Sequence, residues 1–113
     1  MAFTFEVAEL STPVVVVCKG KLTLGSGEEL RNEVKVIAQM HKEIVLEMSH
    51  VDYVDSFGLG ILVTAYVSAR SAGCRLRLAN LTTRVRNLLS LTQILRVIET
   101  FDHAIPPGVD QLP

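Results

Sequence analysis

The chain has 113 residues, 49% of them hydrophobic and 20% charged, and 11 Lys and Arg against 12 Asp and Glu leave a net charge of −1. This predicts one globular domain that needs no disulfides, with Cys18 and Cys74 as small buried hydrophobic residues suited to a reducing cytosol. The balanced charge argues against direct nucleic-acid binding, which requires clustered Lys and Arg.

No stretch of the sequence has the features expected of a membrane anchor or a secretory signal. The longest apolar stretch, Phe57 to Ala69, is shorter than the roughly 20 residues that cross a bilayer. The first ten residues contain Glu6 and no positively charged segment. We therefore expect a soluble, cytoplasmic protein that does not insert into a membrane.

The first two expected strands differ in their hydrophobic pattern. Phe3, Phe5 and Val7 alternate with polar residues, which predicts a strand with one solvent-facing side at an antiparallel edge of the sheet. Residues 14–17 are all valine. An unbroken β-branched run of this kind is typical of a strand buried on both faces inside a parallel sheet.

A helix is expected after the second strand. Ser26 and Glu29 are spaced as in a capping box, in which the two side chains satisfy backbone amides at the start of a helix. The helix is expected to run to about His41, because apolar residues follow at helical spacing: Leu30, Val34 and Ile37.

The rest of the chain is expected to alternate between strands and helices. Short apolar segments predict three further strands, at residues 44–48, 75–78 and 97–101. Residues 51–54 lead into a second helix that begins near Ser56 and ends at Gly73, where a left-handed C-cap is favoured. Thr82 or Thr83 is expected to cap a third helix.

Three strand-helix-strand units in sequence imply right-handed crossovers and parallel strands. The expected fold is a single α/β domain over residues 1–113, with helices packed on a mixed, mostly parallel sheet of four to five strands and an antiparallel edge strand. Residues 102–113 contain three prolines and a glycine and are expected to form a loosely held tail. Loops after parallel strands meet at one rim, where ligands and partners usually bind. Three loops are expected there, at residues 21–26, 49–56 and 80–83.

The middle loop carries the most unusual motif of the chain, VDSFGLG at residues 54–60. Asp55 or Ser56 can act as the N-cap of the helix that follows, and the amides and dipole at a helix start favour a phosphate on Ser56. The residues alone leave two interpretations open. One is a cap followed by glycines that permit close packing of helix and sheet, and the other is a modification site.

This motif, after a buried strand and at the start of a helix, resembles the signature of the STAS domain family of bacterial anti-sigma-factor antagonists. Residues 17–22 resemble the second strand of that family and the loop that follows it. Residues 78–81, with the apolar positions after them, resemble its passage into the third helix. Together the resemblance covers about residues 3–101.

In that family the serine directly after the aspartate of the motif is phosphorylated by a partner that is both anti-sigma factor and serine kinase, and Ser56 is the matching residue. The resemblance implies that the unphosphorylated protein captures this partner and frees the sigma factor. Phosphorylation would end the capture, and a separate serine phosphatase would reverse it. The antagonist itself is then not an enzyme, and it needs no cofactor because the kinase binds ATP and magnesium.

Two residues depart from the family pattern. Phe57 stands where a small Ser or Thr is usual, and Thr23 stands where an acidic residue is common. We expect Phe57 and Ile61 to form an exposed apolar pair beside Ser56, unless the tail or the third helix covers them. The other apolar positions of the helix are expected to face the core: Leu59, Leu62, Val63 and Tyr66. The residues expected to bind the partner are Thr23, Leu24, Asp55, Phe57, Gly58, Leu59 and Ile61.

The chief alternative is a constitutive STAS subunit of a stress-signalling scaffold or of a lipid-transport ATPase complex. Thr23 and Phe57 favour this alternative, whereas Asp55 and Ser56 together favour the phosphorylation switch. Direct nucleotide binding would need a phosphate-cradling loop, and a serine hydrolase would need a G-x-S-x-G elbow; the sequence has neither. The three histidines lack metal-ligand spacing, so no metal site is expected.

Overall fold

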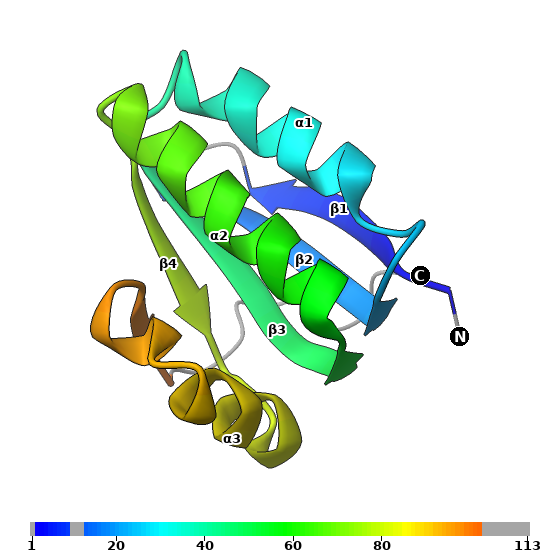
Figure 1. Ribbon diagram of the computed structural model, residues 1–113. Helices are drawn as coiled ribbons and strands as arrows, with labels where there is room; N and C mark the ends of the chain where they lie inside the picture. Colours follow the sequence, from blue (N-terminus) through cyan, green and yellow to red (C-terminus); the bar gives the residue numbers. More distant parts are fainter. Residues whose placement is uncertain (1, 10–12, 103–113) are drawn as a thin grey trace.

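The computed structural model describes residues 2–9 and 13–102, so nearly all of the tail expected at 102–113 lies outside the described residues. Five strands form one sheet in the order β1-β2-β3-β4-β5 (Figure 1). β1 pairs antiparallel with β2, and the other neighbours pair in parallel. This confirms the mixed, mostly parallel sheet with an antiparallel edge strand. The strands are β1 (Thr4–Glu9), β2 (Val14–Leu22), β3 (Glu43–Val54), β4 (Arg75–Ala79) and β5 (Glu99–Phe101).

Three helices share one hydrophobic core with one face of the sheet. α1 and α2 lie side by side across the sheet, and α3 packs against β3 (Figure 1). None of the helices in the described part of the chain is long and apolar enough to cross a membrane. The helices are α1 (Glu28–Ala38), α2 (Ser56–Ser71) and α3 (Thr83–Leu91), and a short 3-10 helix, η1 (Ile94–Arg96), precedes β5.

The four consecutive valines of β2 are buried on both faces of the sheet, as predicted. Val14 and Val16 belong to the core under the helices, whereas Val15 and Val17 form a separate small cluster. Successive side chains of a strand point to opposite faces, so a continuous apolar run is needed where both faces are covered.

β3 is longer than predicted, and the reason is its pairing with β2. The sequence predicts a strand at 44–48 followed by a loop, but β3 continues to Val54. After an irregularity in the register, pairing resumes at Lys19 and His50 and extends to Leu22 and Val54. Pairing with β2 therefore keeps residues 49–54 extended, although their polar sequence is typical of a loop. The rim consequently begins at Thr23 and Asp55.

The start of α1 also differs from the prediction. The N-cap is Gly27, with φ of 92° and no side-chain hydrogen bond, so the predicted capping box is wrong. The Ser26 hydroxyl instead accepts a hydrogen bond from the Thr23 amide at 2.9 Å and lies 3.0 Å from the Thr23 carbonyl oxygen, to which it can donate. Because this hydroxyl closes the preceding turn, it is not available to cap the helix.

The start of α3 and the end of α2 follow local sequence signals, whereas α1 ends at Ala38, before the expected His41. The Thr82 hydroxyl accepts a hydrogen bond from the Val85 amide at 3.3 Å, which confirms the cap of α3. Gly73 follows the C-cap of α2 with φ of 79°, the left-handed conformation predicted for it. β5 begins at Glu99, two residues later than expected, because the amides of Val97 and Ile98 bond to the Ile94 carbonyl oxygen and continue the turn after η1.

A buried carboxylate supports the sheet below the rim. Glu47 on β3 is almost fully buried and accepts hydrogen bonds from the Ser49 amide at 2.7 Å and from Asn80 Nδ2 at 2.6 Å. Burial raises the pKa of the nearby Cys18 thiol, and the charge of Glu47 raises it further. Cys18 therefore remains a protonated thiol in the core, which agrees with its predicted role as a small buried residue.

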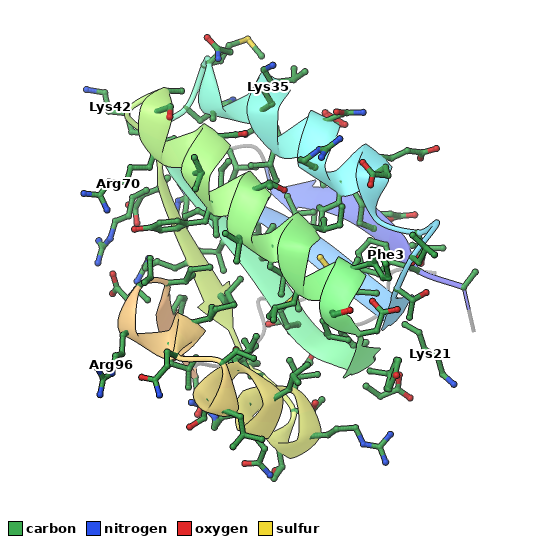
Figure 2. All side chains as sticks on the ribbon, viewed as in Figure 1. Phe3, Lys21, Lys35, Lys42, Arg70 and Arg96 are labelled. Atoms are coloured by element: carbon green, nitrogen blue, oxygen red, sulfur yellow. The ribbon has the colours of Figure 1, made fainter. Side chains whose placement is uncertain are left out.

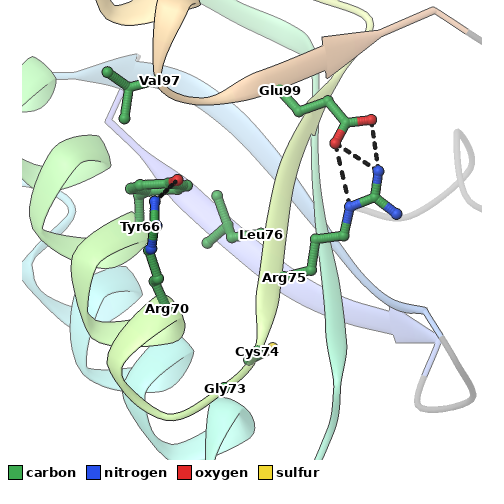
Figure 3. A pocket seen from close by; sticks show the side chains of 8 residues that line it. All are labelled: Tyr66, Arg70, Gly73, Cys74, Arg75, Leu76, Val97 and Glu99. Carbon is green, nitrogen blue, oxygen red and sulfur yellow. Dashed lines mark hydrogen bonds and ion pairs between the residues drawn. The ribbon is translucent and has the colours of Figure 1, made fainter.

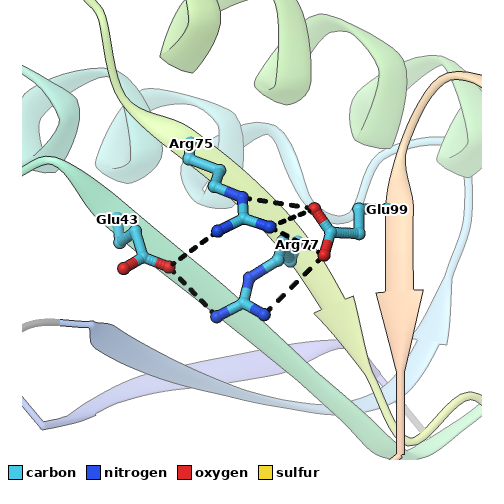
Figure 4. A network of polar contacts seen from close by, with 4 residues as sticks. All are labelled: Glu43, Arg75, Arg77 and Glu99. Atoms are coloured by element: carbon cyan, nitrogen blue, oxygen red, sulfur yellow. Dashed lines mark hydrogen bonds and ion pairs between the residues drawn. The ribbon is translucent and has the colours of Figure 1, made fainter.

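The sheet face that the helices leave uncovered carries an ion-pair network across β3, β4 and β5 (Figure 4). Arg75 Nη2 lies 2.6 Å from Glu99 Oε1, and Arg77 Nη2 lies 3.0 Å from Glu43 Oε2. The guanidinium of Arg77 also stacks 4.4 Å from the centroid of the Phe101 ring. These contacts attach the short edge strand β5 to its neighbours.

Candidate functional site

The candidate site lies at the start of α2, where Asp55 acts as the N-cap. One carboxylate oxygen of Asp55 accepts a hydrogen bond from the Gly58 amide at 2.8 Å. The other accepts one from the Leu24 amide at 3.2 Å, 31 positions earlier in the chain. Of the two predicted candidates for the cap, Asp55 is the one used, and its carboxylate joins α2 to the loop between β2 and α1.

Leu22, the last residue of β2, is in close contact with this first turn of α2. The backbone amide of Asp55 donates to the Leu22 carbonyl oxygen at 3.2 Å. A Cβ atom at Gly58 would overlap that same carbonyl group, so only glycine allows the helix to approach the strand end so closely. A Cβ at Gly60 would meet nothing within 4 Å, so packing explains the first glycine of the motif but not the second.

Ser56 is the first residue of α2, and its side chain is exposed. The Ser56 hydroxyl forms no hydrogen bond with any residue that the structure describes, because the neighbouring carboxylate of Asp55 already caps the helix. The first amides of a helix have no carbonyl partner within it, and the helix dipole places partial positive charge there. A phosphate at this hydroxyl would therefore displace no existing contact.

The loop of residues 23–26 lies directly beside the start of α2. Leu24 is 69% exposed, while its backbone amide is bonded to Asp55. Thr23 is half-buried, with its hydroxyl 3.4 Å from the Ser26 hydroxyl. The structure thus brings the loop of Thr23 and Leu24 beside Ser56 at the start of α2, through the carboxylate of Asp55.

The prediction of an exposed pair of Phe57 and Ile61 is wrong for one of its members. Phe57 is 57% exposed, but Ile61 is 6% exposed and lies under α1, where a Cβ at Gly27 would be 3.6 Å from its side chain. Val63, which was expected to face the core, is exposed instead. The other core-facing positions are confirmed, since Leu62 is buried and Leu59 and Tyr66 pack against the core while half-buried.

Gly58 is buried as well. Seven residues were expected to bind a partner, and two of them have clearly exposed side chains, Leu24 and Phe57.

The sequence analysis missed a further pair at the strand ends. Tyr53 is half-exposed, and Lys21 Nζ lies 6.0 Å from the centroid of its ring. The pair was missed because β3 was expected to end before it.

A separate hollow of ≈ 340 Å³ lies at the far end of α2, beside β4 and β5 (Figure 3). Its charged groups are already paired, because Arg70 Nη1 donates to the Tyr66 hydroxyl at 3.1 Å and Arg75 binds Glu99. The hollow shares no residue with the start of α2, so it is not part of the candidate site.

The arrangement of a capping aspartate, an exposed serine and a buried glycine stands within a family match that spans most of the chain. The STAS domain model matches residues 4–104. The chain belongs to the STAS domain family. This STAS domain is 25% identical over 99 residues to the anti-sigma-B factor antagonist of Bacillus subtilis, and the match covers 88% of this chain and 91% of that protein.

Solved structures show the same fold. The anti-sigma factor antagonist SpoIIAA in its unphosphorylated form superposes with a TM-score of 0.68 at 18% identity, covering 97% of this chain and 95% of that one. The phosphorylated form of SpoIIAA from Bacillus gives 0.68 at 17% identity, covering 99% and 100%. A sulfate transporter family protein from Wolinella succinogenes gives 0.71 at 23% identity, covering 79% and 75%. At these identities the likeness concerns the fold alone.

The hydrogen bonds of Asp55 predict a graded effect of substitution on stability. Asp55→Asn keeps an oxygen for the Gly58 amide but loses the acceptor for Leu24, whereas Asp55→Ala loses both. We expect Asp55→Ala to lower the free energy of unfolding by about 1–2 kcal/mol and Asp55→Asn by less. Urea unfolding measures both, with the exposed Asp52→Ala as control. Equal stability of Asp55→Ala and Asp52→Ala would contradict the structural role of this carboxylate.

Proposed function

We propose that this STAS domain protein is an anti-sigma-factor antagonist. Its unphosphorylated form binds an anti-sigma factor with serine kinase activity, phosphorylation of Ser56 releases that partner, and a serine phosphatase restores binding. The observation that carries the proposal is the exposed hydroxyl of Ser56 at the first residue of α2, next to a carboxylate that already caps the helix. In this role the protein acts in the cytoplasm and binds its partner without catalysing a reaction.

The electrostatics of the site support release by phosphorylation. A phosphoserine carries about −1.5 to −2 charges at neutral pH. In a complex that covers the start of α2, this charge would be desolvated close to the carboxylate of Asp55, and both effects weaken binding. In the unbound domain the same phosphate faces solvent and the positive end of the helix dipole. Phosphorylation can therefore weaken the complex without unfolding the protein.

The exposed apolar side chains around Ser56 are suited to contact the partner. Phe57 follows Ser56 directly. The backbone amide of Leu24 donates a hydrogen bond to the carboxylate of Asp55, so the exposed Leu24 side chain lies in the loop beside Ser56. Three other residues that were expected to bind the partner contribute indirectly, because they pack the helix against the sheet and against α1: Gly58, Leu59 and Ile61. A large aromatic side chain in the centre of an interface commonly contributes more than 1 kcal/mol to binding.

Ser56 should be the regulatory phosphorylation site. With a purified anti-sigma factor kinase, Ser56→Ala should bind without accepting phosphate, and Ser56→Asp should bind about tenfold more weakly or worse because of like-charge repulsion. Ser68→Ala, on the same helix, is the matched control and should behave like the unmodified protein. Phosphopeptide mapping that places the phosphate on Ser68 or Thr64 would refute the assignment. Binding unaffected by Ser56→Asp would favour a constitutive STAS subunit instead.

Phe57 and Ile61 should have opposite effects when truncated, because one is exposed and the other is core. Phe57→Ala should weaken partner binding by more than about 1 kcal/mol and change stability by about 0.5 kcal/mol or less. Ile61→Ala should lower the free energy of unfolding by about 2–5 kcal/mol. Binding titration and urea unfolding of both variants test this. A loss of stability in Phe57→Ala as large as that in Ile61→Ala would show that the ring belongs to the core.

Thr23→Asp should sharpen the switch, because Thr23 lies in the loop bonded to Asp55. A second negative charge about 8 Å from a phosphate on Ser56 costs roughly 2 kcal/mol at an effective dielectric of about 20. The ratio of partner affinities without and with phosphate should therefore rise. Thr64→Asp is the control, since two turns of helix place it more than a Debye length of about 8 Å away. An unchanged affinity ratio would overturn this prediction.

A further inference from the structure

A groove runs between the edge strand β1 and helix α1, apart from the hydroxyl of Ser56. It consists of two hollows, of ≈ 480 Å³ and ≈ 300 Å³, which share Phe5 and Glu29 in their linings. In Figure 2, Phe3 lies below the start of α1, at the end of the groove where the loop of residues 25–27 joins the helix. The groove therefore extends along the first turns of α1 as far as Val36.

The floor of the groove is apolar and only partly covered. Phe3 and Phe5 are half-buried, with their ring centroids 6.3 Å apart. Both rings lie on the sheet face that carries the helices, because Phe5 pairs with Cys18 of the core. Val36 on α1 is 55% exposed and lines the same groove. Apolar side chains of both β1 and α1 are therefore partly exposed to solvent along the groove.

The α1 wall of the groove is acidic. Glu29 and Glu33 are four residues apart, so they lie on the same side of the helix, where like charges are mildly destabilising. Neither carboxylate forms an ion pair or hydrogen bond with any residue that the structure describes. Glu28, also in the lining, differs because it pairs with Arg31 at 2.7 Å. Two unpaired acids therefore face an open apolar floor.

β1 offers a backbone edge along the same groove. Within the described chain it pairs with β2 alone and ends the sheet on that side. Edge strands are usually protected by charged side chains, Pro or irregular pairing. Residues 4–9 (TFEVAE) contain no Lys or Pro; their charged residues, Glu6 and Glu9, are both acidic, and the register with β2 shifts between Val7 and Glu9. Among residues 2–9 and 13–102 no strand pairs with the outer backbone groups of β1, so another extended segment can pair with them.

We propose that this groove binds an extended, basic peptide segment of a protein partner. The segment adds a strand to the outer edge of β1, places apolar side chains on Phe3 and Phe5, and brings Lys or Arg side chains to Glu29 and Glu33. A second copy of β1 fits less well, because residues 4–9 have no Lys or Arg to bring to Glu29 and Glu33. The proposal does not depend on the role of Ser56.

A labelled heptapeptide, Lys-Thr-Val-Thr-Lys-Thr-Val, tests this directly by fluorescence anisotropy and by amide chemical shifts of the full chain, because its Lys and Val side chains share one face of an extended strand. The Lys/Val peptide should bind, with the largest shifts in residues 2–9 and in α1. A Glu/Val peptide and a Lys/Val peptide methylated on alternate backbone nitrogens should bind much more weakly, since one loses the charge match and the other loses the strand hydrogen bonds. Equal binding of the Lys/Val and Glu/Val peptides, or shifts centred elsewhere, would overturn the proposal.

Variants on the surface of α1 separate the groove from general charge effects. Glu29→Gln and Glu33→Gln should each weaken binding of the Lys/Val peptide by about two- to fivefold, the range typical of exposed charge pairs. Asp52→Asn removes one exposed acid outside the groove and should leave the affinity unchanged. Equal losses in Asp52→Asn and Glu33→Gln would refute the site. Dimerisation through β1 in the absence of peptide, detected by sedimentation, would assign the edge to a second copy instead.

Discussion

The close contact between the end of β2 and the first turn of α2 determines the geometry of the candidate site. The Leu22 carbonyl oxygen accepts the Asp55 amide, and Gly58 leaves room for the helix at this point. The side chain of Leu22 is fully buried beneath the helices, where a Cβ at Gly27 would overlap it. Because α1 and α2 both begin against one strand end, their first turns are held in fixed positions relative to each other. The exposed residues of the rim are attached to these first turns and are therefore held in place with them.

This contact also supports the proposal that Ser56 is modified. Asp55 supplies both the helix cap and the bond to the Leu24 amide, so the structural requirements at the start of α2 are met without the Ser56 hydroxyl. Below the rim, Glu47 connects β3 to the loop after β4 through Asn80. A rigid support of this kind allows an added charge to act on an interface while the fold stays intact, which is what a binding switch requires.

Several features follow from local sequence alone, because their physical causes act over a few residues. The alternation in residues 3–7 identified the antiparallel edge strand, and the valine run identified a strand buried on both faces. Asp55 and Thr82 were among the predicted caps because a short oxygen-bearing side chain before a helix satisfies its first amides. Gly73 takes the left-handed conformation that a helix end favours. The motif, with residues 17–22 and 78–81, also indicated the family that the match over residues 4–104 confirms. The phosphorylation of Ser56 stays a prediction.

The remaining features depended on segments far apart in the sequence. The length of β3 depends on pairing with β2, and the Ser26 hydroxyl closes a turn that its spacing to Glu29 could not reveal. Ile61 is buried and Val63 is exposed because α1 packs on only one side of α2. α2 has apolar residues on several sides, so its own periodicity predicted Leu59, Leu62 and Tyr66 correctly but could not decide between Ile61 and Val63. Local propensity and spacing determined where the elements begin and what they can bury, whereas the tertiary structure decided which faces meet, because burial is a property of the neighbours as much as of the residue.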